Sequence, residues 1–223
     1  MGTMDKKITV VGEGNSVFNQ FMRELRDSSI QGDRMRFRKN LFRCSQILAY
    51  ELSKLLDYET KEITTPLGSL EMDLIEDQPV LVSILRAGVP MHNGFLDYFD
   101  HADNGFVSAY RKHTGGGKFI VQIEYLAMPS VEGGTLILLD PMIASGKSIV
   151  LTKQAIIPAQ GQPEKIFMVG IIASEEGLDY VRRMCPDVQI VVGAIDNELT
   201  AKSYIVPGLG DAGDLAFGPK TSG

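Results

Sequence analysis

Short apolar runs alternate along this chain with segments whose apolar residues recur at helical spacing. The expected strands lie at residues 79–85, 105–110, 136–139, 165–173 and 188–194. The expected helices lie at residues 33–56, 89–99, 147–160 and 175–184. Continuous apolar runs are typical of strands buried on both faces, as parallel strands are. The alternation therefore predicts an α/β fold with a doubly wound, mostly parallel sheet.

A pair of strands is expected outside this sheet. Residues 60–65 and 69–75 flank a Pro66-Leu67-Gly68 turn, which predicts an antiparallel β-arm. The sequence has no internal repeat, low-complexity block or long linker, so we expect a single domain over residues 1–223. Its expected parts are N-terminal helices at about 15–57, a core at about 78–196 and a C-terminal segment at about 197–218.

The segment at residues 136–148 carries the clearest candidate chemistry. An aliphatic run ends at Asp140, a loop of small residues follows, and a helix is expected from Lys147. Ligands of α/β sheets bind beyond the carboxyl ends of strands, and a helix N-terminus favours a phosphate. Small loop residues let the backbone approach that phosphate. Asp140 would repel a phosphate, so it suits ligand hydroxyls or the water shell of a metal.

Two other interpretations of this segment are open. Residues 146–148 copy the end of a nucleotide-triphosphate P-loop, but Pro141 stands where that motif needs a glycine. Because proline has a fixed φ and no N–H, the P-loop is disfavoured. A plain turn between strand and helix, without a ligand, is the second alternative.

Four charged residues fall at the expected carboxyl ends of strands: Arg86, Arg111, Asp140 and Asp196. Such convergence is expected of a ligand site. The planar fork of Arg86 suits phosphate oxygens, although a structural salt bridge fits it equally well. Arg111 opens onto a glycine-rich stretch at residues 113–118, which fits either a flap over an anion or a solvated hairpin.

Residues 204–214 contain three glycines, a proline and an alanine, which excludes a regular helix or strand. Such a segment presents backbone N–H and C=O groups at close range, as needed to read a flat polar ring. A disordered tail is the alternative, but Ile205, Val206, Leu209, Leu215 and Phe217 supply apolar anchors against it.

The composition of the chain limits the classes of partner that it is expected to bind. The 223 residues carry a net charge of −6, which disfavours nucleic acid and anionic membranes as partners. No apolar run reaches membrane-spanning length. The two cysteines, Cys44 and Cys185, form no disulfide framework, so a reduced, cytoplasmic protein is the simplest expectation.

The motifs at residues 84–88, 110–111, 140–148 and 204–214 together resemble the uracil phosphoribosyltransferase family over nearly the whole chain. The resemblance implies a type I phosphoribosyltransferase fold. It implies that phosphoribosyl diphosphate (PRPP) and uracil give UMP and pyrophosphate, with Mg²⁺ as the cofactor. The C-terminal segment would form a hood that binds uracil.

The resemblance also implies a role for each candidate residue. Those implied in catalysis are Arg86, Arg111, Asp140 and Asp211. Those implied in PRPP binding are Arg86, Arg111, Asp140, Pro141, Met142, Ile143, Ala144, Ser145, Gly146, Lys147, Ser148 and Asp211. Those implied in uracil binding are Ile205, Gly210, Asp211 and Ala212. No direct protein ligand of Mg²⁺ is implied, because substrate oxygens and water would bind it.

The chain departs from the family pattern at three places. Lys147 replaces a usual glycine, residues 112–117 lack the usual acid, and Leu215-Ala216 replace a basic or polar residue. We expect the Lys147 side chain to point to solvent. The resemblance implies a homodimer or higher homo-oligomer and makes GTP a candidate effector. Two alternative functions stay open: a non-catalytic, nucleotide-binding regulator on the same fold, and a structural or interaction protein with a relic pocket.

Overall fold

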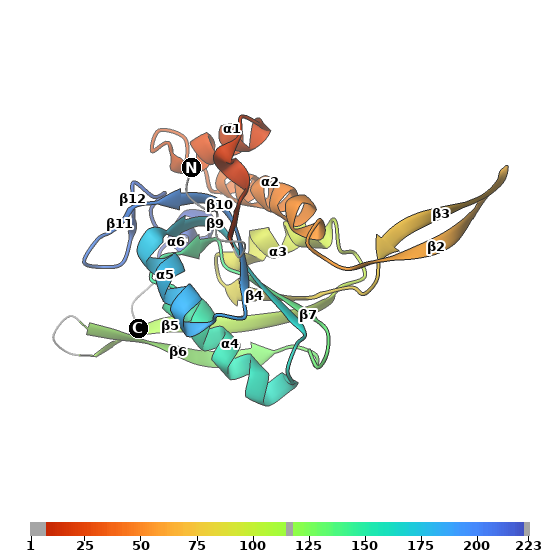
Figure 1. Ribbon diagram of the computed structural model, residues 1–223. Coiled ribbons are helices and arrows are strands. Elements are labelled where there is room, and N and C mark those ends of the chain that lie inside the picture. The colour runs from red at the N-terminus through yellow and green to blue at the C-terminus, as the bar shows by residue number, and fades with distance from the viewer. Residues whose placement is uncertain (1–7, 115–117, 221–223) are drawn as a thin grey trace, which may run out of the picture.

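The computed structural model describes residues 8–114 and 118–220 (Figure 1). The strands of its main sheet are β1 Ile8–Val10, β4 Val80–Leu85, β5 Asp103–Thr114, β6 Lys118–Ala127, β7 Thr135–Leu139, β8 Met142–Ile143, β9 Lys165–Ser174 and β10 Gln189–Asp196. Their order is β1-β10-β9-β7-β4-β5-β6, with β8 also paired to β9. β6 runs antiparallel to β5, and the other neighbours are parallel. The predicted mostly parallel sheet is confirmed.

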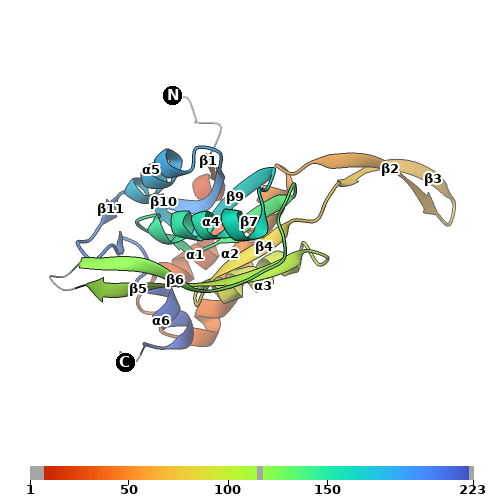
Figure 2. The ribbon, with the colours of Figure 1, turned by 90° about the horizontal axis from the view of Figure 1, so that it is seen from below.

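Helices cover both faces of this sheet. The helices are α1 Val17–Arg26, α2 Arg34–Ser53, α3 Gly88–Leu96, α4 Lys147–Gln160 and α5 Glu175–Met184, and a 3₁₀ turn spans Val11–Glu13. The buried residues of α1, α2 and α3 join one hydrophobic core, and those of α4 and α5 join the other. Figure 2 shows α4 and α5 on the opposite side of the sheet from α2. The sheet is therefore doubly wound, as predicted.

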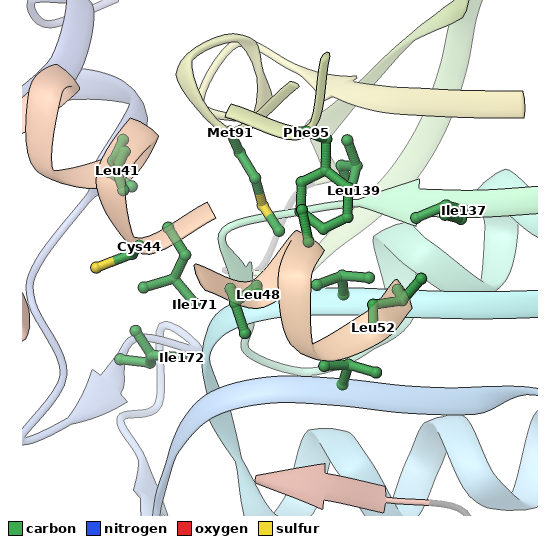
Figure 3. Close-up of a cluster of buried hydrophobic side chains, with 14 of the residues drawn as sticks. Leu41, Cys44, Leu48, Leu52, Met91, Phe95, Ile137, Leu139, Ile171 and Ile172 are labelled. Carbon is green, nitrogen blue, oxygen red and sulfur yellow. The ribbon is translucent and has the colours of Figure 1, made fainter. Parts of the chain in front are cut away.

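The strand that leads to the candidate phosphate loop shows how one apolar run serves both faces. Successive side chains of a strand point to opposite faces. Ile137 and Leu139 pack in the core under α2 and α3, as Figure 3 shows, while Leu136 and Leu138 pack in the core under α4. All four are fully buried. This double burial holds the end of β7 firmly, and with it the position of Asp140.

The hairpin of β5 and β6 differs from the sequence expectation. β5 was predicted to end at Tyr110, but it continues to Thr114, and Arg111 pairs with Val121 inside the ladder. Backbone pairing in an antiparallel ribbon does not require apolar side chains, so the polar composition after Tyr110 did not end the strand. Arg111 therefore lies within the strand, not at its carboxyl end. The proposed flap at residues 115–117 lies outside the described residues.

Two smaller units leave the sheet. The predicted arm is confirmed as β2 Tyr58–Thr65 and β3 Gly68–Ile75, an antiparallel ribbon that projects from the body (Figures 1 and 2). The C-terminal segment forms β11 Glu198–Leu199, β12 Ile205–Val206 and α6 Ala212–Phe217. Within the described part of the chain, no helix is both long and apolar enough to cross a membrane.

Candidate active site

The candidate phosphate loop connects β7 to α4 and follows the predicted plan. Asp140 comes directly after β7, and its Oδ1 accepts a hydrogen bond from the Met142 N–H at 3.2 Å. Ile143 is 1% exposed, and its side chain packs in the core under α4. Gly146, at φ 70°, precedes the first residue of α4, Lys147, which is exposed. The first N–H groups of α4 thus face the loop and suit an anion.

The N-terminal end of α5 packs against this loop and is hydrogen-bonded to it. The buried Ser174 hydroxyl donates to the Ala144 carbonyl at 2.6 Å and accepts from the Gly177 N–H at 2.9 Å. A Cβ at Gly177 would lie 2.0 Å from the Ala144 oxygen, and one at Gly146 would lie 2.7 Å from the Gly177 oxygen. The loop and α5 therefore approach very closely, which fixes the candidate phosphate loop.

The loop after β4 lies beside the Asp140 strand and reaches the C-terminal segment. A Cβ at Gly88 would lie 3.1 Å from the Leu139 oxygen, so this loop packs directly on the end of β7. The Arg86 guanidinium donates to Asp214 Oδ1 at 2.9 Å and to the Gly218 carbonyl at 3.2 Å. The peptide bond before Arg86 is cis. The sequence left Arg86 as either a clamp or a salt-bridge partner, and the structure shows it in a salt bridge.

The C-terminal segment is folded and anchored by buried residues, so the alternative prediction of a disordered tail is wrong. Ile205, Leu209 and Ala212 are at most 4% exposed. Gly210 has φ 89°, a conformation that favours glycine. Asp211 caps α6 by accepting a hydrogen bond from the Asp214 N–H at 3.0 Å.

The segment brings two predicted catalytic residues together. A Cβ at Gly213 would lie 3.3 Å from Asp211 Oδ1 and 3.7 Å from Arg86 Nη2. The Asp211 carboxylate and the Arg86 guanidinium thus flank the same glycine. Asp140 and Arg86 follow neighbouring parallel strands, as their sequence positions predicted. Arg111 lies within β5 and not at its carboxyl end, where it was predicted.

Sequence reasoning missed the contacts that Asp214 and Asp196 make. Asp214 was only part of a motif, although an acid one helical turn after Asp211 is a usable signal for a charge at the same helix end. Asp196 lies at the carboxyl end of β10, as predicted, and its carboxylate is bound by Arg26. Nothing local in the sequence predicts that pair.

Neither a thiol nucleophile nor a protein-built metal cage is apparent in the described residues. Burial raises the pKa of both Cys44 and Cys185, so neither is a thiolate near neutral pH. Across residues 8–114 and 118–220, no group of three His, Cys, Asp or Glu side chains is placed to hold a metal ion. The Asp140 carboxylate offers the hard oxygen that Mg²⁺ favours, so a substrate-borne Mg²⁺ fits this end of the sheet.

The doubly wound sheet, the acid at the end of β7 and the small-residue loop before α4 define a type I phosphoribosyltransferase fold. A family model described as uracil phosphoribosyltransferase matches residues 14–219. The chain therefore belongs to the uracil phosphoribosyltransferase family.

Individual relatives agree over nearly full length. A uracil phosphoribosyltransferase of Porphyromonas gingivalis is 47% identical over 94% of this chain and 97% of its own length. One of Thermococcus gammatolerans is 36% identical over 92% of this chain and 91% of its own. The solved structure of the AQ2163 protein from Aquifex aeolicus superposes with a TM-score of 0.83 at 29% identity, covering 95% of this chain and 98% of that one.

Proposed function

We propose that this protein transfers the phosphoribosyl group of PRPP to uracil, at a site formed by the Asp140 loop, the Arg86 loop and the C-terminal hood at residues 197–218. Family membership supports the reaction, which gives UMP and pyrophosphate. One observation carries the location: Arg86 and Asp211 flank Gly213. The group proposed to hold the leaving diphosphate thus lies beside the segment proposed to hold the base.

The PRPP end of the site is built mainly from backbone. The 5′-phosphate would lie against residues 144–148 and the N-terminus of α4, where N–H groups and the helix dipole favour negative charge. Asp140 would accept hydrogen bonds from the ribose hydroxyls. The backbone of residues 141–143 would complete the wall of this pocket, and Lys147 would contribute its N–H while its side chain faces solvent.

The uracil end would read the base through main-chain groups. Ile205, Gly210 and Ala212 lie on a segment whose turns are fixed by glycines, so their N–H and C=O groups have defined directions. Uracil offers two carbonyl acceptors and one N3–H donor. Cytosine exchanges two of these groups and would leave buried partners unpaired, at about 1–3 kcal/mol for each.

Catalysis would rest on positioning and charge. Departure of the diphosphate from the ribose C1 builds negative charge on the leaving group, which Arg86 and Arg111 would stabilise. When bound through the diphosphate oxygens and water, Mg²⁺ supplies further positive charge to the same leaving group. Uracil N1 is a weak nucleophile, so its alignment with C1 contributes much of the rate. Asp211 is the candidate to accept the N1 proton, through water.

We also propose a homodimer or higher homo-oligomer, a cytoplasmic location and GTP as a candidate effector. The projecting arm supports assembly, because a lone two-stranded ribbon is at best marginally stable in water. The buried, free cysteines support a reducing compartment. The effector rests on resemblance to the family alone.

A direct assay of UMP formation tests the reaction. The purified protein should convert uracil and PRPP to UMP, and removal of Mg²⁺ by a chelator should abolish turnover. Cytosine should be used at least about tenfold less well, as expected from one unpaired buried group. Binding of UMP or PRPP without any turnover would instead identify a non-catalytic regulator.

A further inference from the structure

Side chains from the N-terminal helices contact the main chain of the hood. Arg26, in the last turn of α1, donates through Nη1 to the Gly208 carbonyl at 3.0 Å. Gln31, between α1 and α2, donates through Nε2 to the Leu209 carbonyl at 3.2 Å. Two carbonyl groups that precede Gly210 are thus held by a part of the chain far away in sequence.

An ion pair completes this attachment. Arg26 meets Asp196 through two hydrogen bonds, Nη1 to Oδ2 at 2.7 Å and Nη2 to Oδ1 at 2.9 Å. Asp196, at the end of β10, is 7% exposed. Its Oδ2 also accepts a hydrogen bond from the Gly208 N–H at 2.9 Å. Both polar backbone groups of Gly208 are therefore bound by one pair of opposite charges, of which Asp196 is buried and Arg26 is partly exposed.

Gly208 occupies a point where the hood turns sharply. Its φ is 60°, and a Cβ there would lie 2.0 Å from the Ile205 carbonyl oxygen. The peptide between Val206 and Pro207 is cis. The turn thus lies between Ile205 on one side and Gly210 on the other, which are the ends facing the turn of the two proposed uracil-reading stretches, Ile205 and residues 210–212. A shift of this turn would misalign both ends relative to the base.

We propose that Asp196 and Arg26 are positioning residues for uracil, acting through Gly208, with Gln31 as a second support through Leu209. The proposal rests on the proposed function, because it assigns the hood backbone to the base. Where backbone N–H and C=O groups bind the ligand, their orientation depends on how the segment is held. Side chains that contact the segment therefore set that orientation. The Arg26–Asp196 pair should therefore affect uracil more than PRPP.

The steady-state KM values for the two substrates test this division. Asp196→Asn removes the charge that binds Arg26, and Arg26→Lys keeps the charge but loses the two-pronged contact. Each variant should raise the KM for uracil about tenfold or more, equal to roughly 1.4 kcal/mol if KM tracks Kd. The KM for PRPP should stay within about twofold. The preference for uracil over cytosine should fall as well.

A matched control separates positioning from general stability. Arg36 on α2 pairs with Glu24 on α1 at 3.2 Å, so Arg36→Lys perturbs another ion pair of α1, one that joins this helix to α2 instead of β10. It should leave the KM for uracil unchanged. Thermal unfolding of every variant, read beside the kinetics, shows whether a change in KM merely follows a loss of fold.

The outcomes are distinct. Unchanged KM values for both substrates, or equal rises in both, would overturn the positioning role. If Asp196→Asn fails to fold, Arg26→Lys and Gln31→Met decide between the same outcomes. Absence of UMP formation by the unsubstituted protein would instead contradict the proposed function, before any variant is compared.

Discussion

Arg86 is the residue at which the two halves of the proposed site meet. Its guanidinium binds the Asp214 carboxylate and the Gly218 carbonyl of the C-terminal segment. The Arg86–Asp214 pair is partly exposed, with 34% and 41% of the side chains accessible. Such a pair contributes at most about 1 kcal/mol. A diphosphate, which carries more charge than a carboxylate, can therefore compete for this arginine.

Replacing Arg86 should impair chemistry more than folding. Arg86→Met removes the donor that is proposed to face the developing charge of the leaving diphosphate, so kcat should fall about 10²–10³-fold. Stopped assays of UMP formation would measure the loss. Arg182→Met, which breaks the exposed pair with Asp179, is the control and should keep full activity. Near-normal turnover by a folded Arg86→Met protein would restrict that arginine to a structural role.

Replacing the partner of Arg86 should have a small effect of the opposite sign. Asp214→Asn removes a charge that competes with the diphosphate for Arg86, so the KM for PRPP should fall, by no more than about fivefold for a pair worth about 1 kcal/mol. In an Arg86→Met background the same substitution should lose this effect. A strong rise in KM would mean that Asp214 orients Arg86 for the ligand.

The helices and strands were the most predictable level of this molecule. The helices at residues 147–160 and 175–184 have the bounds that the sequence predicted. Local chemistry explains this success: Gly146 and Gly161 flank the first helix, and Ser174 caps the second. The central strands were equally evident because both of their faces are buried.

The contacts between elements were not predictable in the same way. Arg26 and Asp196 are 170 positions apart, and no sequence pattern around either residue predicts their contact. The sequence placed Asp196 at a strand end, which is correct, but could not show that α1 covers it. The candidate site was thus predicted as a set of loops, while the side chains that hold the hood required the folded structure.

The attachment of the phosphate loop to α5 gives a prediction at this scale. Ser174→Ala leaves the buried Ala144 carbonyl and Gly177 N–H without their shared partner, so the free energy of unfolding should fall by about 1–3 kcal/mol. The KM for PRPP should rise, because Ala144 belongs to the proposed phosphate cradle. Chemical denaturation and steady-state kinetics measure the two effects.

Ser16→Ala is the matched control for that experiment. Ser16 caps α1 as Ser174 caps α5, by accepting a hydrogen bond from a backbone N–H. Its loss should cost about 1 kcal/mol of stability and leave the KM for PRPP unchanged. Equal effects of the two substitutions on that KM would show that the cradle does not depend on Ser174.

The molecule as a whole is one α/β body with a ribbon that extends beyond it (Figure 1). Residues directly opposite in an antiparallel pair share a face of the ribbon. One face therefore carries Leu70 opposite Ile63 and Met72 opposite Lys61, while the other carries Ser69 opposite Thr64. Leu70 and Met72 are each 45% exposed. An apolar face on an unsupported ribbon is expected to be covered by another molecule.

We expect that cover to be a second copy of this chain, since a homo-oligomer with closed symmetry is the commonest assembly of soluble proteins. Leu70→Lys combined with Met72→Lys places two charges on the apolar face, so the oligomer should dissociate toward the monomer at micromolar concentration. Light scattering coupled to size-exclusion chromatography would measure the mass.

Ser69→Lys is the control, because it adds a positive charge to the same strand but on the polar face, and it should leave the mass unchanged. A monomeric unsubstituted protein, or an oligomer that survives both lysines, would show that the arm does not mediate assembly. Parallel assays of UMP formation would then show whether the site within one chain depends on that assembly.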